Sequence, residues 1–473
     1  MIVTGLALGA VLGIVMQRGR FCVTGMLRDL FLQRSWRTLV ALFIVIAVHA
    51  VGIAALTGAG VIAPEATTFK PAAVVIGGFI FGLAIVLAGG CASGTWYRSG
   101  EGLVGSWIAL IMYCLSAAAM KTGPLTGFNE FLRSWDTGWT DLPRTFGVSL
   151  WWFAIPFALF TGWAANRFLQ REAAAPKVAS LGGSRWKRPL HVYAAAVAVG
   201  VLGVIAWPLS AATGRNDGLG ITTPSANLAN WTVTGDAERM DWGVMLVLGI
   251  LVGSWIAARA TGEFRVRLPD ATQAVRSVVG GVGMGVGASL AGGCTVGNGM
   301  VQTSLFSYQG WVALLFMALG VGVAAKLWLK PAEAPTSAED EVLDDAASHG
   351  VAESVTVGAP QRPAGGRGGD GAAVAGNFQV ATGLVTVAGK KKAKAREIGQ
   401  GRYFLDQMGA VCPFPLIETK DVLDSLDAGE ELVIDFDCTQ GTETIPRWAA
   451  ENGHEVTDFH AKGDAGWQIT IRK

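Results

Sequence analysis

The chain has 473 residues, of which 51% are hydrophobic and only 15% are charged, and its 37 basic and 36 acidic residues nearly cancel. A net charge this close to zero gives no sign of the large basic surface with which proteins bind nucleic acid. The high apolar fraction and low charged fraction indicate an integral membrane protein over most of the length.

About nine apolar segments are candidates for membrane helices, and several are shorter than the ~20 residues that a full span needs. They fall near 2–17, 38–57, 72–90, 103–120, 148–166, 191–210, 242–260, 275–290 and 311–330. The first has no basic residues before its apolar run, and its arginines come after it. That order predicts a spanning helix with its N-terminus outside, rather than a cleavable signal peptide.

Lysine and arginine alternate in number between successive loops. The loops 17–37, 91–102, 166–190 and 259–276 hold 16 of them, and the loops on the other side hold 6. The positive-inside rule therefore predicts that the first loop and the residues beyond 330 lie in the cytoplasm.

One stretch occurs twice. Residues 75–94 and 278–297 agree at 10 of 20 positions when shifted by 203, and both lead through Gly-Gly into a cysteine, Cys91 and Cys294. Glycine-interrupted apolar segments at matching places in two halves are typical of a transporter's binding site. Close packing of small residues between membrane helices is the alternative interpretation, but it does not explain why a cysteine recurs at the same point.

A third cysteine, Cys22, follows the first apolar segment in the stretch Gln-Arg-Gly-Arg-Phe-Cys-Val-Thr-Gly at 17–25. The second half of the chain has no cysteine at the corresponding place. Arg18 and Arg20 beside it are either positive-inside anchors or part of the same site, and the sequence leaves both open.

The amino-acid composition of the chain changes after residue 330. Residues 331–377 are rich in Ala, Gly, Pro and acids with almost no large apolar residues, which predicts a disordered tether. A basic cluster follows at 390–394. From about 401 the pattern is that of a soluble β-α-β-α-β-β domain, a small two-layer sandwich.

Cys412 lies between the first strand and the first helix of this predicted domain, directly before Pro413. Proline favours the first helical position, which places Cys412 at the N-cap. There the helix dipole and free amides stabilise a thiolate, and a thiolate can carry sulfane sulfur as a persulfide. A purely capping role is the less favoured alternative, because Ser, Thr, Asp and Asn cap better. Cys438 is structural or auxiliary.

The six cysteines form no Cys-x-x-Cys pair and lie far apart, which predicts neither a disulfide scaffold nor a zinc cluster. A soft-metal transporter would need cysteines at ligand spacing from one another or from His and Met. We therefore expect no metal site and no cofactor. No Walker A sequence is present, so ATP is not expected to drive transport from within this chain.

Residues 406–415, Asp-Gln-Met-Gly-Ala-Val-Cys-Pro-Phe-Pro, resemble the signature of the TusA-like (SirA-like) sulfur-carrier family. The resemblance covers roughly 401–473 and includes 445–448, Ile-Pro-Arg-Trp. It implies that Cys412 accepts or passes on sulfane sulfur. Whether it only carries sulfur or also cleaves thiosulfate, as a sulfurtransferase would, stays open.

The first 330 residues resemble the YeeE/YedE family of thiosulfate uptake proteins. The stretches that carry the resemblance are 18–25, 87–107 and 289–300. It implies a helical bundle with inverted pseudo-two-fold symmetry and short re-entrant helices. It also implies that Cys91, Cys294 and Cys22 form a path for thiosulfate, with Cys22 nearest the cytoplasm.

Physical chemistry is consistent with such a path. Thiosulfate is a dianion, and even one charge at mid-bilayer costs several kcal/mol unless other groups replace its hydration. Amides at broken helices can do so, and Gly94 and Gly297 leave those amides accessible. Two thiolates ~4 Å apart would repel by about 4 kcal/mol at an effective dielectric of 20. We therefore expect the three membrane thiols to act protonated, as hydrogen-bond relays.

Other polar residues are candidates for lining the path. Glu101 and Asp29 are more readily interpreted as ion-pair partners of Arg98 and Arg28 than as a proton relay. The auxiliary candidates are Arg20, Gly94, Arg98, Gly297, Asn298 and Gln302.

The sequence thus predicts a membrane transport domain at 1–330, a tether at 331–400 and a sulfur-carrier domain at 401–473. The predicted function is import of thiosulfate across the cytoplasmic (inner) membrane, with the lipid bilayer and downstream cytoplasmic sulfurtransferases as further partners. A membrane-anchored sulfurtransferase, or an importer of another sulfur or selenium species, are the alternatives. A flexible tether of this length spans roughly 40–45 Å and keeps the carrier near the cytoplasmic mouth at about millimolar effective concentration.

Overall fold

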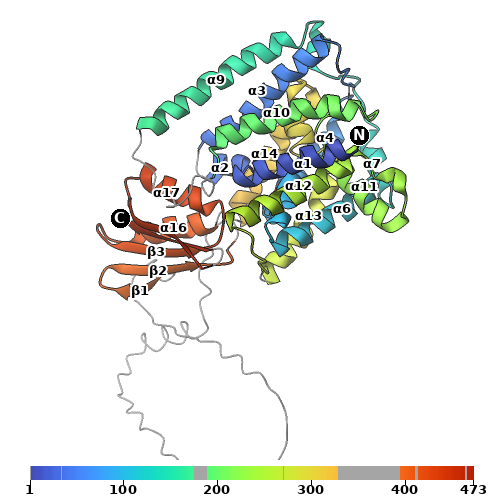
Figure 1. Ribbon diagram of the computed structural model, residues 1–473. Coiled ribbons are helices and arrows are strands. Elements are labelled where there is room, and N and C mark those ends of the chain that lie inside the picture. The colour runs from blue at the N-terminus through green and yellow to red at the C-terminus, as the bar shows by residue number, and fades with distance from the viewer. Residues whose placement is uncertain are drawn as a thin grey trace, which may run out of the picture.

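The computed structural model describes residues 2–32, 35–65, 67–174, 189–269, 271–328, 395–410, 414–463 and 466–473. These residues form a large helical bundle and a small domain built on one sheet, which lies against one end of the bundle (Figure 1). The predicted tether, apart from its last residues, and the basic cluster at 390–394 lie outside the described residues.

Nine long helices occupy the predicted apolar segments. They are α1 (Val3–Arg18), α3 (Arg37–Gly58), α4 (Pro71–Leu87), α6 (Val104–Lys121), α9 (Trp151–Ala174), α10 (Val192–Ala211), α12 (Trp242–Thr261), α13 (Ala271–Ala291) and α14 (Tyr308–Trp328). Among the described residues, eight helical segments are long and apolar enough to cross a membrane, and two of these join a long helix to the short one that follows it. The prediction of a multi-helix membrane part is confirmed.

Shorter helices and turns occur between the long helices along the chain. They are α2 (Val23–Leu32), α5 (Ala92–Gly100), α7 (Thr126–Arg133), α8 (Leu142–Phe146), α11 (Thr222–Thr234), the 3-10 turn η2 (Ala237–Arg239) and the π-helix η3 (Gly297–Gln302). Two of them, α5 and η3, directly follow the two cysteines of the repeat.

Glycines bring the long helices into backbone contact. A Cβ atom on Gly77 of α4 would lie 2.5 Å from a backbone nitrogen of α13, and one on Gly280 of α13 would lie 2.5 Å from a backbone nitrogen at the end of α4. Gly9 of α1 approaches α12 even more closely, 2.1 Å from the carbonyl oxygen of Leu246. Close packing is therefore one role of the repeated glycines, in addition to the helix breaks.

The small domain contains a five-stranded mixed sheet with the order β1-β2-β3-β5-β4. Its elements are β1 (Arg396–Gly399), β2 (Arg402–Gln407), α16 (Phe414–Ser425), β3 (Glu431–Phe436), α17 (Gly441–Glu451), β4 (Glu455–Lys462) and β5 (Gly466–Arg472). Strands β2 and β3 are parallel and the other pairs antiparallel. The predicted β-α-β-α-β-β order is confirmed, with β1 as an additional edge strand.

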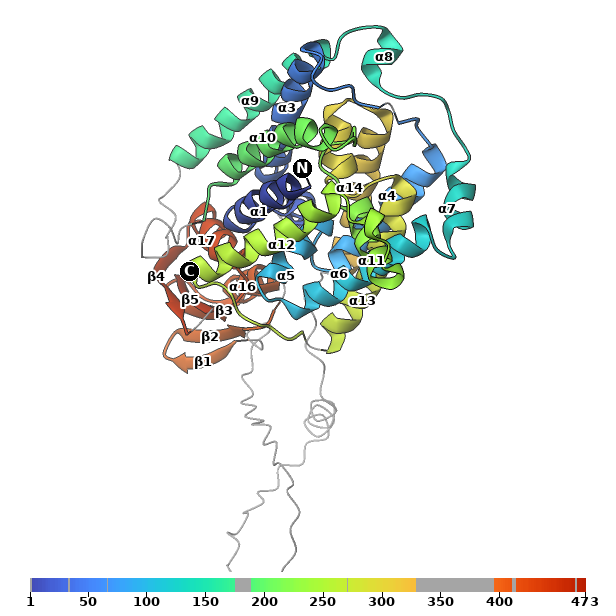
Figure 2. The same cartoon turned by 45° about the vertical axis from the view of Figure 1, so that its right-hand side comes forward.

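The sheet domain docks on the end of the bundle where α2 begins and α9 ends. Figure 2 shows α17 next to the ends of α1 and α10. Residues of α17 share a cavity with residues of α2 and α3. This end of the bundle carries Arg20, Arg28 and Arg37 of the loop 17–37, which the positive-inside rule predicts to be cytoplasmic.

Candidate functional site

The first helix break lies at Cys91. Helix α4 ends at Leu87, Gly89 then takes a left-handed conformation with φ 72°, and Cys91 is the N-cap of α5 with an extended backbone. Only glycine adopts that conformation without strain. The backbone amides of the first turn of α5, including that of Gly94, have no partner within their own helix.

The second break repeats the first. Helix α13 ends at Ala291, and Gly292, the equivalent of Gly89 at the same shift of 203, has φ 78°. Cys294 follows, and the chain continues into the π-helix η3 rather than an α-helix. The prediction of two matching interruptions is confirmed.

Asn298 holds the second break together. Its side-chain amide donates hydrogen bonds to the carbonyl oxygens of Ala291 and Gly293, both at 2.9 Å, and its oxygen accepts one from Gln309 at 3.0 Å. The side chain is fully buried and does not line the adjoining cavity. Asn298 therefore supports the loop of Cys294 instead of facing a cavity.

Cys22 and Cys91 come together. A Cβ atom on Gly94 would lie 3.6 Å from the sulfur of Cys22 and 3.4 Å from that of Cys91, so both thiols lie beside this glycine. Cys91 also lies 3.4 Å from the hydroxyl of Ser93. Both cysteines are buried and free.

Cys294 lies apart from Cys22 and Cys91 and lines a separate cavity of about 250 Å³. This cavity is on the side away from the sheet domain, because α13 begins beside that domain and Cys294 follows the other end of the helix. Gly297, Gln302 and Arg215 line the same cavity. One guanidinium nitrogen of Arg215, Nη1, is buried without a hydrogen-bond partner.

Tyr113 lies in the middle of α6, the helix that packs against α13. It is fully buried, and its hydroxyl donates to Thr222, which lines the outer cavity, at 2.9 Å. No local pattern singles out Tyr113, because the residues of α6 read as an ordinary apolar helix.

Arg98 lines a second cavity, between the bundle and the sheet domain, together with Glu101, Arg267 and Cys438. Its guanidinium donates to the carbonyl of Gly89. In the described part of the chain no salt bridge joins it to Glu101. Asp29, by contrast, pairs with Arg28 at 3.2 Å as predicted.

Arg20 is buried beside Cys22 and pairs with Glu263, a residue that sequence analysis did not identify. Its Nη2 lies 3.2 Å from one carboxylate oxygen of Glu263, and Gln17 donates to the other at 2.6 Å. The backbone of Arg20 has φ 48°, which is uncommon for any residue with a side chain. The ion pair with Glu263 holds the side chain of Arg20 at the cavity that Cys22 also lines.

A charged cluster joins the two domains. Glu172, near the end of α9, accepts hydrogen bonds from Arg37 of the bundle and from Arg447 of α17. Arg447 also bonds Glu443, one turn earlier, at 3.0 Å. Burial tends to raise the pKa of Glu172, but the hydrogen bond from His191 and the two arginines lower it from 4.5 to about 2.

Two findings concern the sheet-domain cysteines. Cys438 is disulfide-bonded, a single bond that the spacing of the cysteines did not predict. Spacing along the chain could not reveal it, because disulfides depend on distance in space. Cys412 lies outside the described residues.

No group of three potential metal ligands occurs among the residues that the structure describes.

The apolar helices and the sheet domain thus define the class: a multi-pass membrane protein with paired helix breaks and a docked α/β domain. Comparisons with known proteins identify both parts. The sequence model of the sulphur transport family matches residues 18–323, and that of the sulfurtransferase TusA family matches 403–473. The chain belongs to the sulphur transport family and carries a C-terminal TusA domain.

Curated relatives fall into the same two groups. The thiosulfate transporter TsuA of Escherichia coli is 48% identical over 70% of this chain and 94% of its own length. TsuA of Spirochaeta thermophila is 31% identical over 68% of this chain and 97% of its own. The putative sulfur carrier protein TsuB of Escherichia coli is 59% identical over 15% of this chain and 92% of its own length.

Proposed function

We propose that the protein imports thiosulfate across the cytoplasmic membrane and delivers it to its own TusA domain. The observation that carries the proposal is the arrangement of the two helix breaks. Each places a cysteine and a left-handed glycine inside the bundle, one beside the outer cavity and one beside Cys22. The names of the two transporter relatives support thiosulfate as the substrate.

The chemistry of the breaks suits a sulfur dianion. Helix N-terminal amides and dipoles replace water around the oxyanion end. A neutral thiol adds a weak S–H donor for the soft terminal sulfur. We infer a sequence of contacts from Cys294 through Tyr113 to Cys91 and Cys22, in which several weak sites let the anion leave as readily as it enters.

The proposed orientation puts the N-terminus outside and the sheet domain in the cytoplasm. The docking of that domain on the arginine-rich end of the bundle supports it, because positive loops remain inside. Substrate that passes Cys22 would then meet the TusA domain directly.

Once cytoplasmic thiols have reduced the disulfide of Cys438, Cys412 of the TusA domain is proposed to react as a thiolate. Its sulfur attacks the terminal sulfur of thiosulfate, the S–S bond of thiosulfate breaks, and sulfite leaves with the electron pair. Cys412 keeps the transferred sulfur as a persulfide for downstream sulfurtransferases. Because this reaction lowers the concentration of thiosulfate in the cytoplasm, it would also favour further uptake.

Growth on thiosulfate as sole sulfur source tests the proposal in cells that lack other importers. Cys91→Ala and Cys294→Ala are expected to abolish growth, while Cys412→Ala retains part of the uptake of labelled thiosulfate. The alternative, a membrane-anchored sulfurtransferase, predicts that even the wild-type protein does not support growth in these cells, because no importer is then present.

A further inference from the structure

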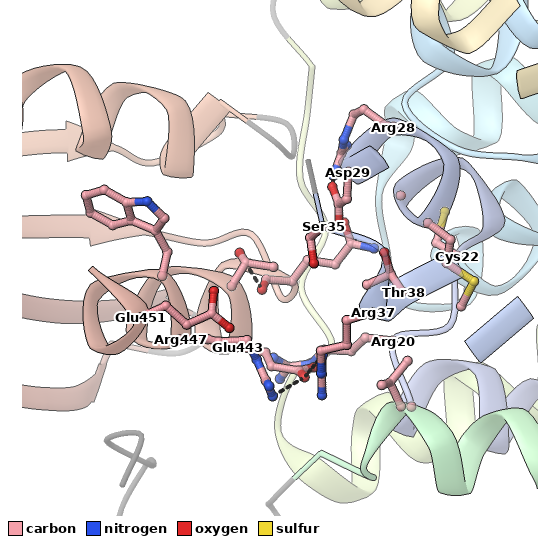
Figure 3. Close-up of a pocket in the computed structure, with 17 residues that line it drawn as sticks. Arg20, Cys22, Arg28, Asp29, Ser35, Arg37, Thr38, Glu443, Arg447 and Glu451 are labelled. Carbon is pink, nitrogen blue, oxygen red and sulfur yellow. Dashed lines mark hydrogen bonds and ion pairs between the residues drawn. The ribbon is translucent and has the colours of Figure 1, made fainter. Parts of the chain in front are cut away.

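A cavity lies between the bundle and the TusA domain, and Cys22 is one of the residues that line it. Residues of α2 and α3 form one wall and residues of α17 the other (Figure 3). Its volume is about 80 Å³, several times the ~15 Å³ that one water molecule requires. The cavity is thus large enough for a small anion.

Four of the side chains that line this cavity each have a buried donor with no hydrogen-bond partner among the described residues. Each belongs to a side chain whose other groups are engaged or packed, and the four come from both domains. They are Nη1 of Arg20, Nη2 of Arg37, Oγ1 of Thr38 and Nε of Arg447. A buried donor without a partner costs about 1–3 kcal/mol, so four around one cavity indicate a ligand that accepts hydrogen bonds.

The two bundle arginines are well suited to hold such a ligand. The side chains of Arg20 and Arg37 are 5% and 8% exposed. Each is anchored through one part of its guanidinium, Arg20 by Glu263 and Arg37 by Glu172, which leaves the remaining nitrogen available. Planar guanidinium groups are the preferred protein donors for oxyanions.

Acidic side chains also line the cavity, but two of the three already have cationic partners. Asp29 pairs with Arg28, and Glu443 pairs with Arg447 and Arg37. Glu451 is the third. The unpartnered donors, rather than the net charge, therefore determine what the cavity accepts.

We propose that this cavity is an exit site for a divalent sulfur oxyanion, shared between the bundle and the TusA domain. Arg20 and Arg37 bind the oxygens on the bundle side, and Arg447 completes the site only while α17 is docked. The proposal rests on the proposed function and names the place where transport and sulfur transfer meet. Either incoming thiosulfate or departing sulfite has the chemistry to bind here.

Protection of Cys22 from alkylation tests the site in the full chain, because Cys22 lines the cavity. Sulfate is the probe, since it has the same charge and does not consume iodoacetamide. The key variant is Arg20→Gln with Glu263→Gln, which removes the donor without leaving a buried carboxylate unpaired. Neutralising the pair Arg402 and Glu431 of the TusA domain, neither of which lines the cavity, in the same way is the matched control.

We expect sulfate to protect Cys22 in the wild type and the control. In the double variant the half-protecting concentration should rise about tenfold or more, the effect of losing one hydrogen bond to a charged group. Glu263→Gln alone should protect at least as well as the wild type, because Arg20 gains a free nitrogen. Unchanged protection in the double variant, or equal loss in Glu263→Gln, would overturn the site.

Thr38→Val gives a second, uncharged test should the double variant fail to fold, with about a threefold rise expected. Calorimetry with thiosulfate and with sulfite then identifies the source of the ligand: the tighter binder is the physiological occupant, and absence of binding by both overturns the proposal. Uptake by the wild-type protein is measured in parallel. Normal uptake with unchanged protection would reject the exit site alone, whereas absent uptake would reject the transport function.

Discussion

The sulfurs of Cys22 and Cys91 both lie against Gly94, within 3.6 Å of the position that a Cβ atom on this glycine would occupy. One cysteine follows the first long helix and the other caps α5, so two separate segments place their thiols at one point. The absence of a side chain at Gly94 keeps the first-turn amides of α5 accessible beside both thiols.

Gly94→Ala is predicted to lower uptake without harming the fold. The added methyl meets the two sulfurs at ordinary van der Waals distance, so it fits. Replacing glycine in a helix should raise the free energy of unfolding by about 0.5–1 kcal/mol. Excluding the anion from one amide should slow uptake about tenfold.

Gly162→Ala in α9 is the matched control, because nothing lies within 4 Å of its Cβ position. It should give the same gain in thermal stability and normal uptake. Wild-type uptake by Gly94→Ala would show that the space beside the two thiols is not used.

Much of this site could be predicted from the sequence, because its signals are local. The repeat at a shift of 203 located both breaks and both cysteines, since a Gly-Gly-Cys interruption acts within a few residues. The partners of Arg20 and Arg447 could not be found in this way. Glu263 and Glu172 are 243 and 275 residues away from them, and only packing brings such residues together. The π-helical form of η3 also depends on its surroundings.

Asn298→Ala is predicted to destabilise the second break. The substitution leaves the carbonyls of Ala291 and Gly293 and the amide of Gln309 without their partner. Each buried group left unsatisfied costs about 1–3 kcal/mol. Thermal unfolding should show a clear loss of stability, and a melting temperature equal to that of the wild type would contradict the supporting role.

Glu172→Gln is predicted to weaken docking of the TusA domain. Energy transfer between one dye on that domain and one on the bundle reports the docking. Transfer should fall at neutral pH, because the amide cannot pair with Arg37 and Arg447 as the carboxylate does. Glu397→Gln, on the exposed strand β1, should leave it unchanged.

The pH dependence of docking follows from the lowered pKa of Glu172. A carboxyl whose pKa falls on docking contributes fully above its ordinary pKa of 4.5 and loses that contribution as pH falls toward about 2. Its contribution should therefore be constant from pH 8 to 5 and decrease below that range. The difference in energy transfer between wild type and Glu172→Gln measures it, and a difference that disappears between pH 8 and 6 would contradict this assignment.

Cys412 is predicted to gain the mass of one sulfur atom when the reduced protein is exposed to thiosulfate. Peptide mass analysis locates the added sulfur, and sulfite should appear in equal amount. Cys114, buried in α6, serves as the internal control and should stay unmodified. Sulfur found only on a membrane cysteine would contradict the division of roles between the two domains.

Uptake of labelled thiosulfate by proteoliposomes that contain the full chain tests the central claim most directly. The account predicts uptake by the wild-type protein and its loss in both Cys91→Ala and Cys294→Ala, with each variant still folded. Undiminished uptake by both variants would show that the two helix breaks do not carry the anion.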